Sequence, residues 1–321
     1  MLLQVSRGED PDVDQRKPGG GRRAKERSFE RVMERFIRLH CQRHNKASTI
    51  RSTRRLLEKE FLTQWRNRDV AELSKGDILK VLDGIVDRGR PGAANHAYAA
   101  ISKFFSWCSE RDLIDTNPCT DVKRPAKLKA RDRILTNREL AHIWLAAGAT
   151  DYPFGPIVQL LALTGQRRGE VANMHWLHVD RQAAVWDIPK ELTKSSRAHV
   201  VPLSQTAMSI IDELPRLHEA FLFPATGSST TTFSGFGKCK KRFDQTCQVS
   251  DWTLHDLRRT AATGMAELGV APHVVERVLN HSSGTFAGVA GVYNRFSYVD
   301  EMRAALELWE GKLRTLAIEN V

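Results

Sequence analysis

Three short clusters of basic side chains in the second half of the chain have the residue types that suit a phosphate group in transition. They are 164–170 (TGQRRGE), 254–259 (LHDLRR) and 279–281 (LNH), and two of the four tyrosines, Tyr293 and Tyr298, follow them. Arginine suits such a group because its planar guanidinium can bind two oxygens at once and keeps its proton. The order of these residues directs attention to chemistry on a phosphate.

The first cluster begins where Gly165 breaks the apolar run 157–163 ahead of a new helix. We expect Arg167 in the first turn of that helix, where free backbone N–H groups and the positive end of the helix dipole favour an anion. Glu170, three positions later, lies on the same face and can hold the guanidinium. Taken alone, such an Arg–Glu pair is more often structural.

The second cluster opens a helix, because Thr253 and Asp256 have the spacing of a capping box. His255 and Arg258 then fall early in this helix and project from one face. Arg259, four positions from His255, is a rival for the same place, and a lone histidine here is more often a hydrogen-bonded cap. The expected buried side consists of Leu254, Leu257, Ala261, Met265 and Leu268.

Lys194 lies in a polar tip between two strand-like stretches, 184–189 and 198–203. Exposed lysines in such a hairpin are usually only solvated, and Lys190 and Arg197 are close rivals.

The histidine pairs and the five scattered cysteines do not indicate a metal site. His40 and His44 have the i,i+4 spacing of ligands but no accompanying carboxylate, and no Cys-x-x-Cys occurs. His175 and His178 are expected on opposite faces of a strand.

Taken in order, Arg167, Lys194, His255, Arg258, His281 and Tyr293 resemble the active-site set of the tyrosine recombinase family. The family motifs are a Thr-Gly-x-Arg-x-x-Glu box, a hairpin lysine before Val-Pro-Leu (here 201–203), His-x-x-Arg, a further histidine and a tyrosine. The resemblance spans roughly residues 28–310. Within the family, the chain most resembles the integrases of temperate phages and genomic islands. Asn280 stands where the family usually has glycine, and the gap to Tyr293 is longer than usual, which leaves Tyr298 as the alternative.

This resemblance implies a mainly α fold with a small β-sheet (α+β), in which an all-helical core-binding domain precedes a catalytic domain of tyrosine recombinase type. It implies a site-specific recombinase that cleaves and rejoins DNA through a 3′-phosphotyrosyl link, so that a mobile element is integrated or excised. A tyrosine-type topoisomerase and a DNA-binding protein without catalysis are the alternatives. No metal or nucleotide cofactor is expected.

The same resemblance implies a role for each site residue. Arg167 and Arg258 clamp the non-bridging oxygens, and Glu170 supports Arg167. His255 moves the proton of Tyr293, His281 donates a hydrogen bond to the phosphate, and Lys194 protonates the departing 5′ oxygen. The implied partners are double-stranded attachment sites, three further copies of the chain when it is on DNA, and an accessory protein that bends DNA. The free chain is expected to be a monomer.

The elements that must position these residues form two domains. We expect a flexible basic tail at 1–27, a helical domain at 28–122, a basic linker at 123–133 and the catalytic domain at 134–321. Four helices are predicted in the helical domain: the first begins at Ser28, the second spans 49–65, the third begins at a cap at Ser74, and the fourth ends at about Glu110. An amphipathic terminal helix is predicted over 299–317. The third helix has the apolar stripe Ile78, Leu79, Val81, Leu82, Ile85 and Val86.

Charge and composition agree with a nucleic-acid partner. Lys plus Arg outnumber Asp plus Glu by 49 to 38, which favours a polyanion. The linker is expected to contact the DNA backbone through Lys123, Arg124, Lys127, Lys129 and Arg131.

No apolar run is long enough for a membrane helix or a signal peptide, so we expect a cytoplasmic protein that joins the nucleoid when bound to DNA. The tail is too short for an arm-binding domain, a function we expect to be absent or truncated.

Overall fold

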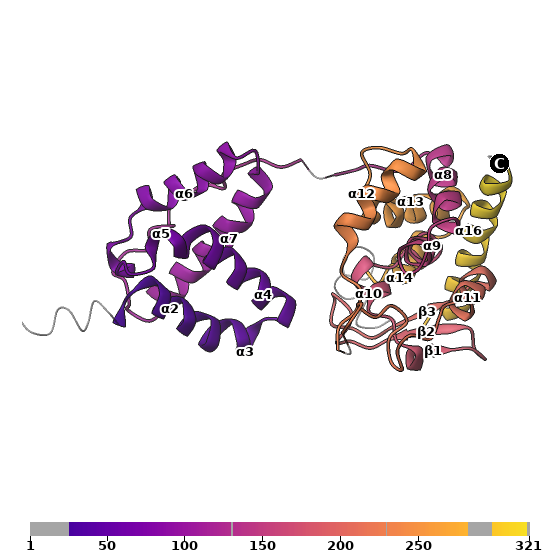
Figure 1. Ribbon diagram of the computed structural model, residues 1–321, viewed down its shortest axis with the longest axis horizontal. Helices are drawn as coiled ribbons and strands as arrows, with labels where there is room; N and C mark the ends of the chain where they lie inside the picture. Colours follow the sequence, from indigo (N-terminus) through magenta and orange to yellow (C-terminus); the bar gives the residue numbers. More distant parts are fainter. Residues whose placement is uncertain (1–25, 130, 229, 282–296, 320–321) are drawn as a thin grey trace, which may run out of the picture. The chain divides into compact units, whose positions relative to one another are not determined.

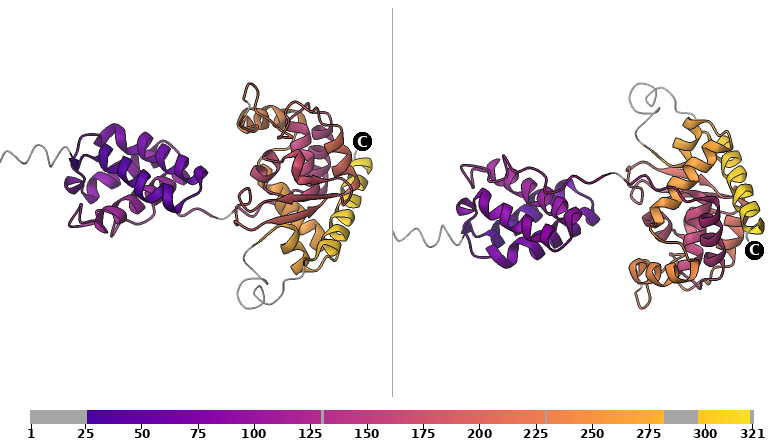
Figure 2. Two further views of the ribbon diagram at one scale, coloured as in Figure 1. Left: turned by 90° about the horizontal axis from the view of Figure 1, so that it is seen from below. Right: turned by 90° about the horizontal axis from the view of Figure 1, so that it is seen from above.

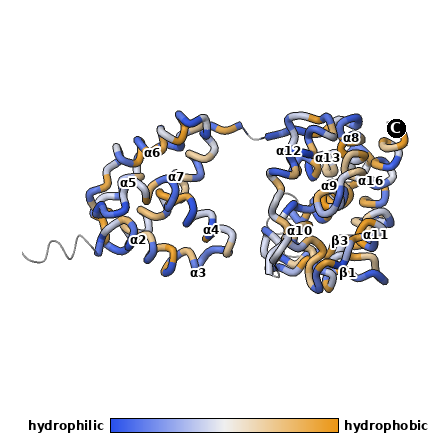
Figure 3. Tube along the Cα trace, in the orientation of Figure 1, coloured by the Kyte–Doolittle hydropathy of each residue, from blue (hydrophilic) through white to orange (hydrophobic). Residues whose placement is uncertain are grey.

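The computed structural model describes residues 26–129, 131–228, 230–281 and 297–319 and divides into two compact units, Met1–Ala130 and Arg131–Val321 (Figure 1). Each unit has its own apolar core. Apolar and polar positions interchange along the helices of both units, as amphipathic helices packed on a core require (Figure 3). The tail predicted at 1–27 lies, except for its last two residues, outside the described residues.

The described part of unit 1 is helical, as predicted. Ser74 caps the third predicted helix, since its Oγ accepts a hydrogen bond from the Asp77 N–H at 3.3 Å. One part of the predicted stripe is wrong: Leu79 is 37% exposed, because the apolar arc of this helix is wider than the arc that the core covers. The elements are α2 (Phe29–Phe36), η3 (Ile37–Cys41), α3 (Gln42–His44), α4 (Ala47–Leu56), η4 (Leu57–Leu62), α5 (Thr63–Trp65), η5 (Val70–Glu72), α6 (Lys75–Asp87) and α7 (Pro91–Ser109).

The basic stretch 123–133 is divided between the two units. Its beginning lies along α7, where the Tyr98 hydroxyl donates to the Val122 carbonyl at 2.7 Å and the Asn95 amide exchanges two hydrogen bonds with the backbone of Ala126. Its end belongs to unit 2, where Arg133 forms an ion pair with Glu139.

Unit 2 combines helices with a small antiparallel sheet of order β1-β2-β3, so the predicted fold class is confirmed. The predicted hairpin is present: Val185 pairs with Pro202 and Ile188 with His199. The elements are α8 (Asn137–Gly148), α9 (Phe154–Thr164), α10 (Arg168–Ala172), η6 (Trp176–His178), β1 (Val179–Asp180), β2 (Val185–Ile188), β3 (His199–Pro202), α11 (Gln205–Asp212), α12 (Phe236–Cys247), α13 (Leu254–Glu267), α14 (Pro272–Val278) and α16 (Val299–Glu319).

The expectation that His175 and His178 occupy a strand is wrong. His178 ends the short helical turn η6, and His175 is the residue before it. The turn brings the two rings together, with their centroids 4.8 Å apart, rather than placing them on opposite faces.

Helix α9 forms the centre of unit 2 and packs against α8, α10, α11, α13 and α16 (Figure 1). Nine of its eleven residues are buried, as is usual for a helix that is apolar on all sides. Because α9 is held on all sides, its position determines where the helix ends at Gly165 and where the first basic cluster begins.

The terminal helix α16 packs on its own unit, against α8, α13, α14 and β3 (Figure 2). The Trp309 indole N–H donates to the Ala162 carbonyl of α9 at 2.8 Å. Its ring fills the space that a side chain at Gly264 would take, since a Cβ built there lies 2.1 Å from the ring. The predicted apolar stripe, consisting of Met302, Ala305, Leu306, Trp309, Leu313 and Leu316, is buried. None of the described helices is both long and apolar enough to span a membrane.

Substitution of Gly264 tests this packing. Gly264→Ala forces a methyl group into the Trp309 ring, and we expect the free energy of unfolding to fall by about 1–3 kcal/mol. Gly311→Ala, at an exposed position of α16 where the added Cβ meets nothing within 4 Å, is the matched control and is expected to stabilise by about 0.5–1 kcal/mol. Urea denaturation followed by circular dichroism measures both, and equal stability of Gly264→Ala and the wild type would contradict this packing.

Candidate functional site

Arg167 is held from two directions by one buried carboxylate. Its Nη1 donates to Glu170 Oε1 at 2.9 Å, and its backbone N–H donates to Glu170 Oε2 at 3.0 Å. Glu170 is 3% exposed, while the Arg167 side chain is 22% exposed. Arg167 is the N-cap of α10, one position before the first turn where it was expected, and it therefore has extended backbone angles.

Arg258 lies almost fully buried beside the loop that precedes Arg167. Its Nη1 donates to the Gly165 carbonyl at 2.8 Å, and its Nη2 donates to the Leu279 carbonyl. Gly165 has φ +63°, which favours glycine, and a Cβ there would lie 3.0 Å from Leu279. The glycine thus allows the loop to approach closely enough for its carbonyl to accept from Arg258.

Three consecutive carbonyls at the end of α14 accept hydrogen bonds from this group of side chains. The Val278 carbonyl accepts from Gln166 Nε2 at 2.7 Å and makes a 3.0 Å contact with His199 Nε2. The Leu279 carbonyl accepts from Arg258, as described above. The Asn280 carbonyl accepts from Arg167 Nη2 at 3.4 Å. The backbone that leads into His281 is thereby attached to both arginines.

Asn280 has φ +48°, in the left-handed region. Asparagine tolerates this conformation better than other residues with a side chain, apart from aspartate. Asn280 therefore keeps the backbone turn that precedes His281, although the family usually has glycine at this position.

His255 is placed by a capping box, as predicted. The Asp256 carboxylate accepts from the Thr253 N–H at 2.8 Å, which fixes the start of α13. Partial desolvation, followed by the charges of Arg258, Arg259 and Arg167, lowers the pKa of His255. Its exposed imidazole is therefore neutral at neutral pH and can accept a proton.

His281 stands in the same electrostatic field. Its pKa is lowered by desolvation and by Arg258 and Arg167, with a smaller effect from His255, whereas Glu276 raises it. The two imidazoles and the two guanidinium groups are thus close enough to influence one another.

The arginine pair carries more positive charge than its surroundings neutralise. Burial and the nearby Arg167 lower the pKa of Arg258 to about 9, while Glu170 raises it. This value leaves Arg258 protonated at neutral pH, so two guanidinium groups lie near the single negative charge of Glu170, which binds Arg167. A site of this kind favours an anion with several oxygens.

A cleft of about 500 Å³ opens beside this group. Arg167, Lys194 and His255 line it together with Arg168, Lys240 and Trp252. Lys194 is exposed, and its backbone N–H lies 3.4 Å from Glu170 Oε1. The hairpin tip therefore touches the same carboxylate that holds Arg167.

The structure brings five of the six predicted site residues together, namely Arg167, Lys194, His255, Arg258 and His281, along with Glu170. The sixth, Tyr293, and the small-residue segment before it lie outside the described residues.

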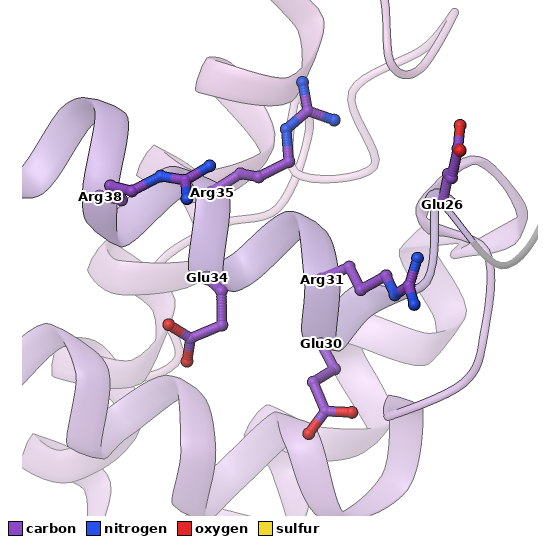
Figure 4. A pocket seen from close by; sticks show the side chains of 6 residues that line it. All are labelled: Glu26, Glu30, Arg31, Glu34, Arg35 and Arg38. Carbon is purple, nitrogen blue, oxygen red and sulfur yellow. The ribbon is translucent and has the colours of Figure 1, made fainter.

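Unit 1 has a charged hollow of about 510 Å³ along α2, and all six residues that line it are charged (Figure 4). Glu34 pairs with Arg54 and Glu30 with Arg66. Figure 4 shows the side chains of the lining arginines leaving the helical segment of α2 and η3 on other sides than these glutamates. Because every lining side chain is charged, the hollow does not suit an apolar ligand. The arginines are Arg31, Arg35 and Arg38.

Comparison with known proteins agrees with this geometry. Residues 133–295 match the model of the phage integrase family, and residues 29–125 match that of the phage integrase central domain. The chain belongs to the phage integrase family.

Relatives of this integrase-family chain include the prophage integrase IntZ of Escherichia coli K12, 26% identical over 81% of this chain and 65% of the relative. The tyrosine recombinase XerC of Roseiflexus castenholzii is 25% identical over 78% of this chain and 85% of its own length. The chain thus spans slightly less than two thirds of the prophage integrase.

Among solved structures, a lambda integrase dimer bound to a COC′ core site is similar, with a TM-score of 0.65 and 19% identity. The match covers 82% of this chain and 98% of that one. At this identity the likeness establishes the fold.

Two residues of the candidate site were missed in the sequence. His199 and Gln166, both nearly buried, hold the Val278 carbonyl beneath the arginines. A signal for His199 was available: it shares the inward alternation of Val201 on β3, so a polar side chain there had to be buried. Gln166 had no such signal, because its burial depends on α14.

The pH dependence of stability tests the burial of His199. Desolvation lowers its pKa to about 4 in the folded chain, against about 6.5 when unfolded. Between these two pH values only the unfolded chain binds the proton. The contribution of neutral His199 to the free energy of unfolding is therefore complete above about pH 6.5 and is lost as the pH falls toward 4. His199→Gln keeps an N–H donor but has no imidazole to titrate. As the pH falls through this window, we expect its free energy of unfolding to fall by about 2–3 kcal/mol less than that of the wild type.

Urea denaturation of both proteins at about pH 7 and about pH 4.5 makes this measurement. His142→Gln, in the same unit, controls for the removal of a histidine as such. An equal loss of stability in the wild type and His199→Gln would contradict a buried neutral imidazole.

Proposed function

We propose that this chain is a site-specific tyrosine recombinase that cleaves and rejoins DNA strands and so integrates or excises a mobile element. One observation carries the proposal: Arg258 and the Glu170-bound Arg167 lie close together, beside two imidazoles whose pKa values are lowered. A phosphodiester in the transition state needs this combination, with fixed positive charge for its oxygens and a base for the proton of the nucleophile.

The arginines retain donors for the phosphate. A guanidinium carries five N–H groups, and the bonds of Arg258 to Gly165 and Leu279 use two of them. Since these bonds fix the plane of the guanidinium, the remaining N–H groups are oriented before DNA binds. Orientation in advance lowers the free energy needed to reach the transition state.

In the proposed step the Tyr293 oxygen forms a bond to phosphorus while the bond from phosphorus to the 5′ oxygen breaks. The hydroxyl has a pKa of about 10, so removing its proton at neutral pH costs about 4 kcal/mol. Neutral His255 accepts this proton, and His281 donates a hydrogen bond to the phosphate. Lys194 protonates the departing 5′ oxygen. The 3′-phosphotyrosyl bond is then attacked by another 5′ hydroxyl, which releases Tyr293.

The alternative nucleophile, Tyr298, is engaged elsewhere. Its ring lies at the start of α16, with its centroid 5.5 Å from that of His273 and the Arg277 guanidinium carbon 5.3 Å from it. These contacts join α14 to α16 and favour a structural role, so we assign the reaction to Tyr293.

The proposed partner is duplex DNA carrying attachment sites, bound by four copies of the chain, with a DNA-bending accessory protein. The structural relatives include a lambda integrase tetramer bound to a Holliday junction. Backbone contacts are proposed for Lys123, Arg124, Lys127 and Lys129, which precede the boundary between the units.

A nicked suicide substrate tests the nucleophile. Tyr293→Phe is expected to abolish the covalent protein–DNA adduct because phenylalanine has no nucleophilic oxygen, whereas Tyr298→Phe is expected to keep it. Denaturing electrophoresis detects the adduct. The reverse pattern would transfer the role to Tyr298, and a wild type that binds DNA without forming an adduct would favour a DNA-binding protein without catalysis.

The salt dependence of DNA binding tests the basic stretch. Lys127→Ala/Lys129→Ala should reduce the slope of log K against log salt by about 0.9 for each phosphate that the variant no longer neutralises. The control Lys59→Ala/Lys312→Ala removes the same charge from lysines that form ion pairs with Glu60 and Glu267, and should leave the slope nearly unchanged. Equal slopes for both double variants would contradict the proposed role of Lys127 and Lys129.

A further inference from the structure

Arg131 stands at the boundary of unit 2, and its guanidinium grips the start of the helix that carries His255 and Arg258. Its Nε donates to Asp256 Oδ2 at 2.9 Å and its Nη1 to Asp251 Oδ1 at 3.0 Å. Its Nη2 donates to the Asp251 carbonyl at 2.5 Å. All three nitrogens of the guanidinium therefore bind acceptors near the first turn of α13.

The carboxylate that Arg131 binds has a central place in this turn. The Asp256 side chain is fully buried, and besides Arg131 it accepts from the Thr253 N–H and from Arg259 Nη1, the latter at 2.9 Å. A buried carboxylate needs such partners because an unpaired charge there is unfavourable. Asp256 thus fixes the orientation of the first turn of α13 through its hydrogen bonds, and Arg131 fixes Asp256.

A second contact joins the same two segments. The Leu135 N–H donates to the Thr260 hydroxyl at 3.0 Å, and that hydroxyl donates to the Asp256 carbonyl at 2.8 Å. The chain from 131 to 135 therefore runs along the first turns of α13. The end of the basic stretch is attached to the catalytic helix at two points.

We infer that Arg131 is a positioning residue for His255 and Arg258, and that it joins the DNA-binding basic stretch to the helix that presents them. The inference rests on the proposed function. It changes the role expected for Arg131: a phosphate on its guanidinium would compete with two carboxylates and a backbone carbonyl, which its three nitrogens already bind. The neighbouring Lys129, by contrast, is exposed and suits a backbone contact.

The chemistry of the side chain makes the two roles separable. A lysine at 131 would supply nearly the same charge to DNA, but its single ammonium group cannot reproduce the planar fork that bridges Asp256 and Asp251. A positioning role requires the fork, whereas a contact with a phosphate requires mainly the charge.

The test measures the single-turnover rate of adduct formation at saturating suicide substrate, together with the dissociation constant for intact sites. For Arg131→Ala and Arg131→Lys we expect the rate to fall by about ten- to a hundredfold and the dissociation constant to change by less than about threefold, because small displacements of reacting groups reduce rates steeply. Arg181→Ala is the matched control, because it removes an arginine of the same unit that pairs with Asp212 and does not line the cleft, and we expect it to leave both the saturated rate and the dissociation constant unchanged.

Asp251→Asn provides a second variant in case Arg131→Ala does not fold. The Asp251 side chain is 80% exposed, so the change is compatible with folding while it weakens one of the two partners of Arg131. We expect a smaller fall in the same saturated rate, with unchanged affinity.

Three outcomes would overturn the inference. They are a wild-type saturated rate in Arg131→Ala, full rescue by Arg131→Lys, and an unchanged rate in Asp251→Asn. The first of these, with weaker binding and a lower salt slope, would restore Arg131 as a phosphate contact. Absence of an adduct with the wild type would instead overturn the proposed function, and this inference with it.

Discussion

Two positive charges held close together in a largely buried place are the constraint on which the rest of unit 2 depends. Arg167 and Arg258 repel each other, and the desolvation of Arg258 adds to the unfavourable free energy. Glu170 and the carbonyls of Gly165, Leu279 and Asn280 offset this cost. Since carbonyl dipoles reduce the repulsion without cancelling the net charge, the pair keeps its attraction for an anion. Two of the residues that supply these carbonyls, Gly165 and Asn280, have left-handed backbone angles.

This arrangement needs a scaffold that cannot shift. Helix α9 ends at Gly165, α13 carries His255 and Arg258, and α14 supplies the accepting carbonyls. The three helices meet in one core, which α16 closes through Trp309 packed on Gly264. A displacement of the terminal helix would therefore be transmitted to the helices that carry the site, because close-packed interiors transmit displacement.

The boundary between the units is more than a flexible connection. Asn95 and Tyr98 hold the first part of the basic stretch on α7, while Arg131 and Leu135 attach its end to α13. Basic residues that look alike in the sequence thus have different surroundings. The exposed lysines are suited to phosphates, and Arg131 is suited to holding a carboxylate in place.

The sequence by itself determined the features whose causes are local. Caps at Ser74 and Thr253, the apolar periods of the helices and the β-hairpin were all predictable, because each depends on residues within one or two turns of one another. The order of the basic clusters was sufficient to identify the family. Where a prediction failed, as for the strand at His175 and His178, the short apolar alternation was ambiguous and the helical turn η6 prevailed.

Only the tertiary structure decided which distant groups meet. Arg131 and Asp256 are 125 positions apart, and no local pattern distinguishes that arginine from its basic neighbours. The burial of His199, the attachment of Gln166 to α14 and the docking of α16 on its own unit likewise depend on packing between elements. Hydrogen bonds and ion pairs depend on distance in space, which the sequence sets only through the complete fold.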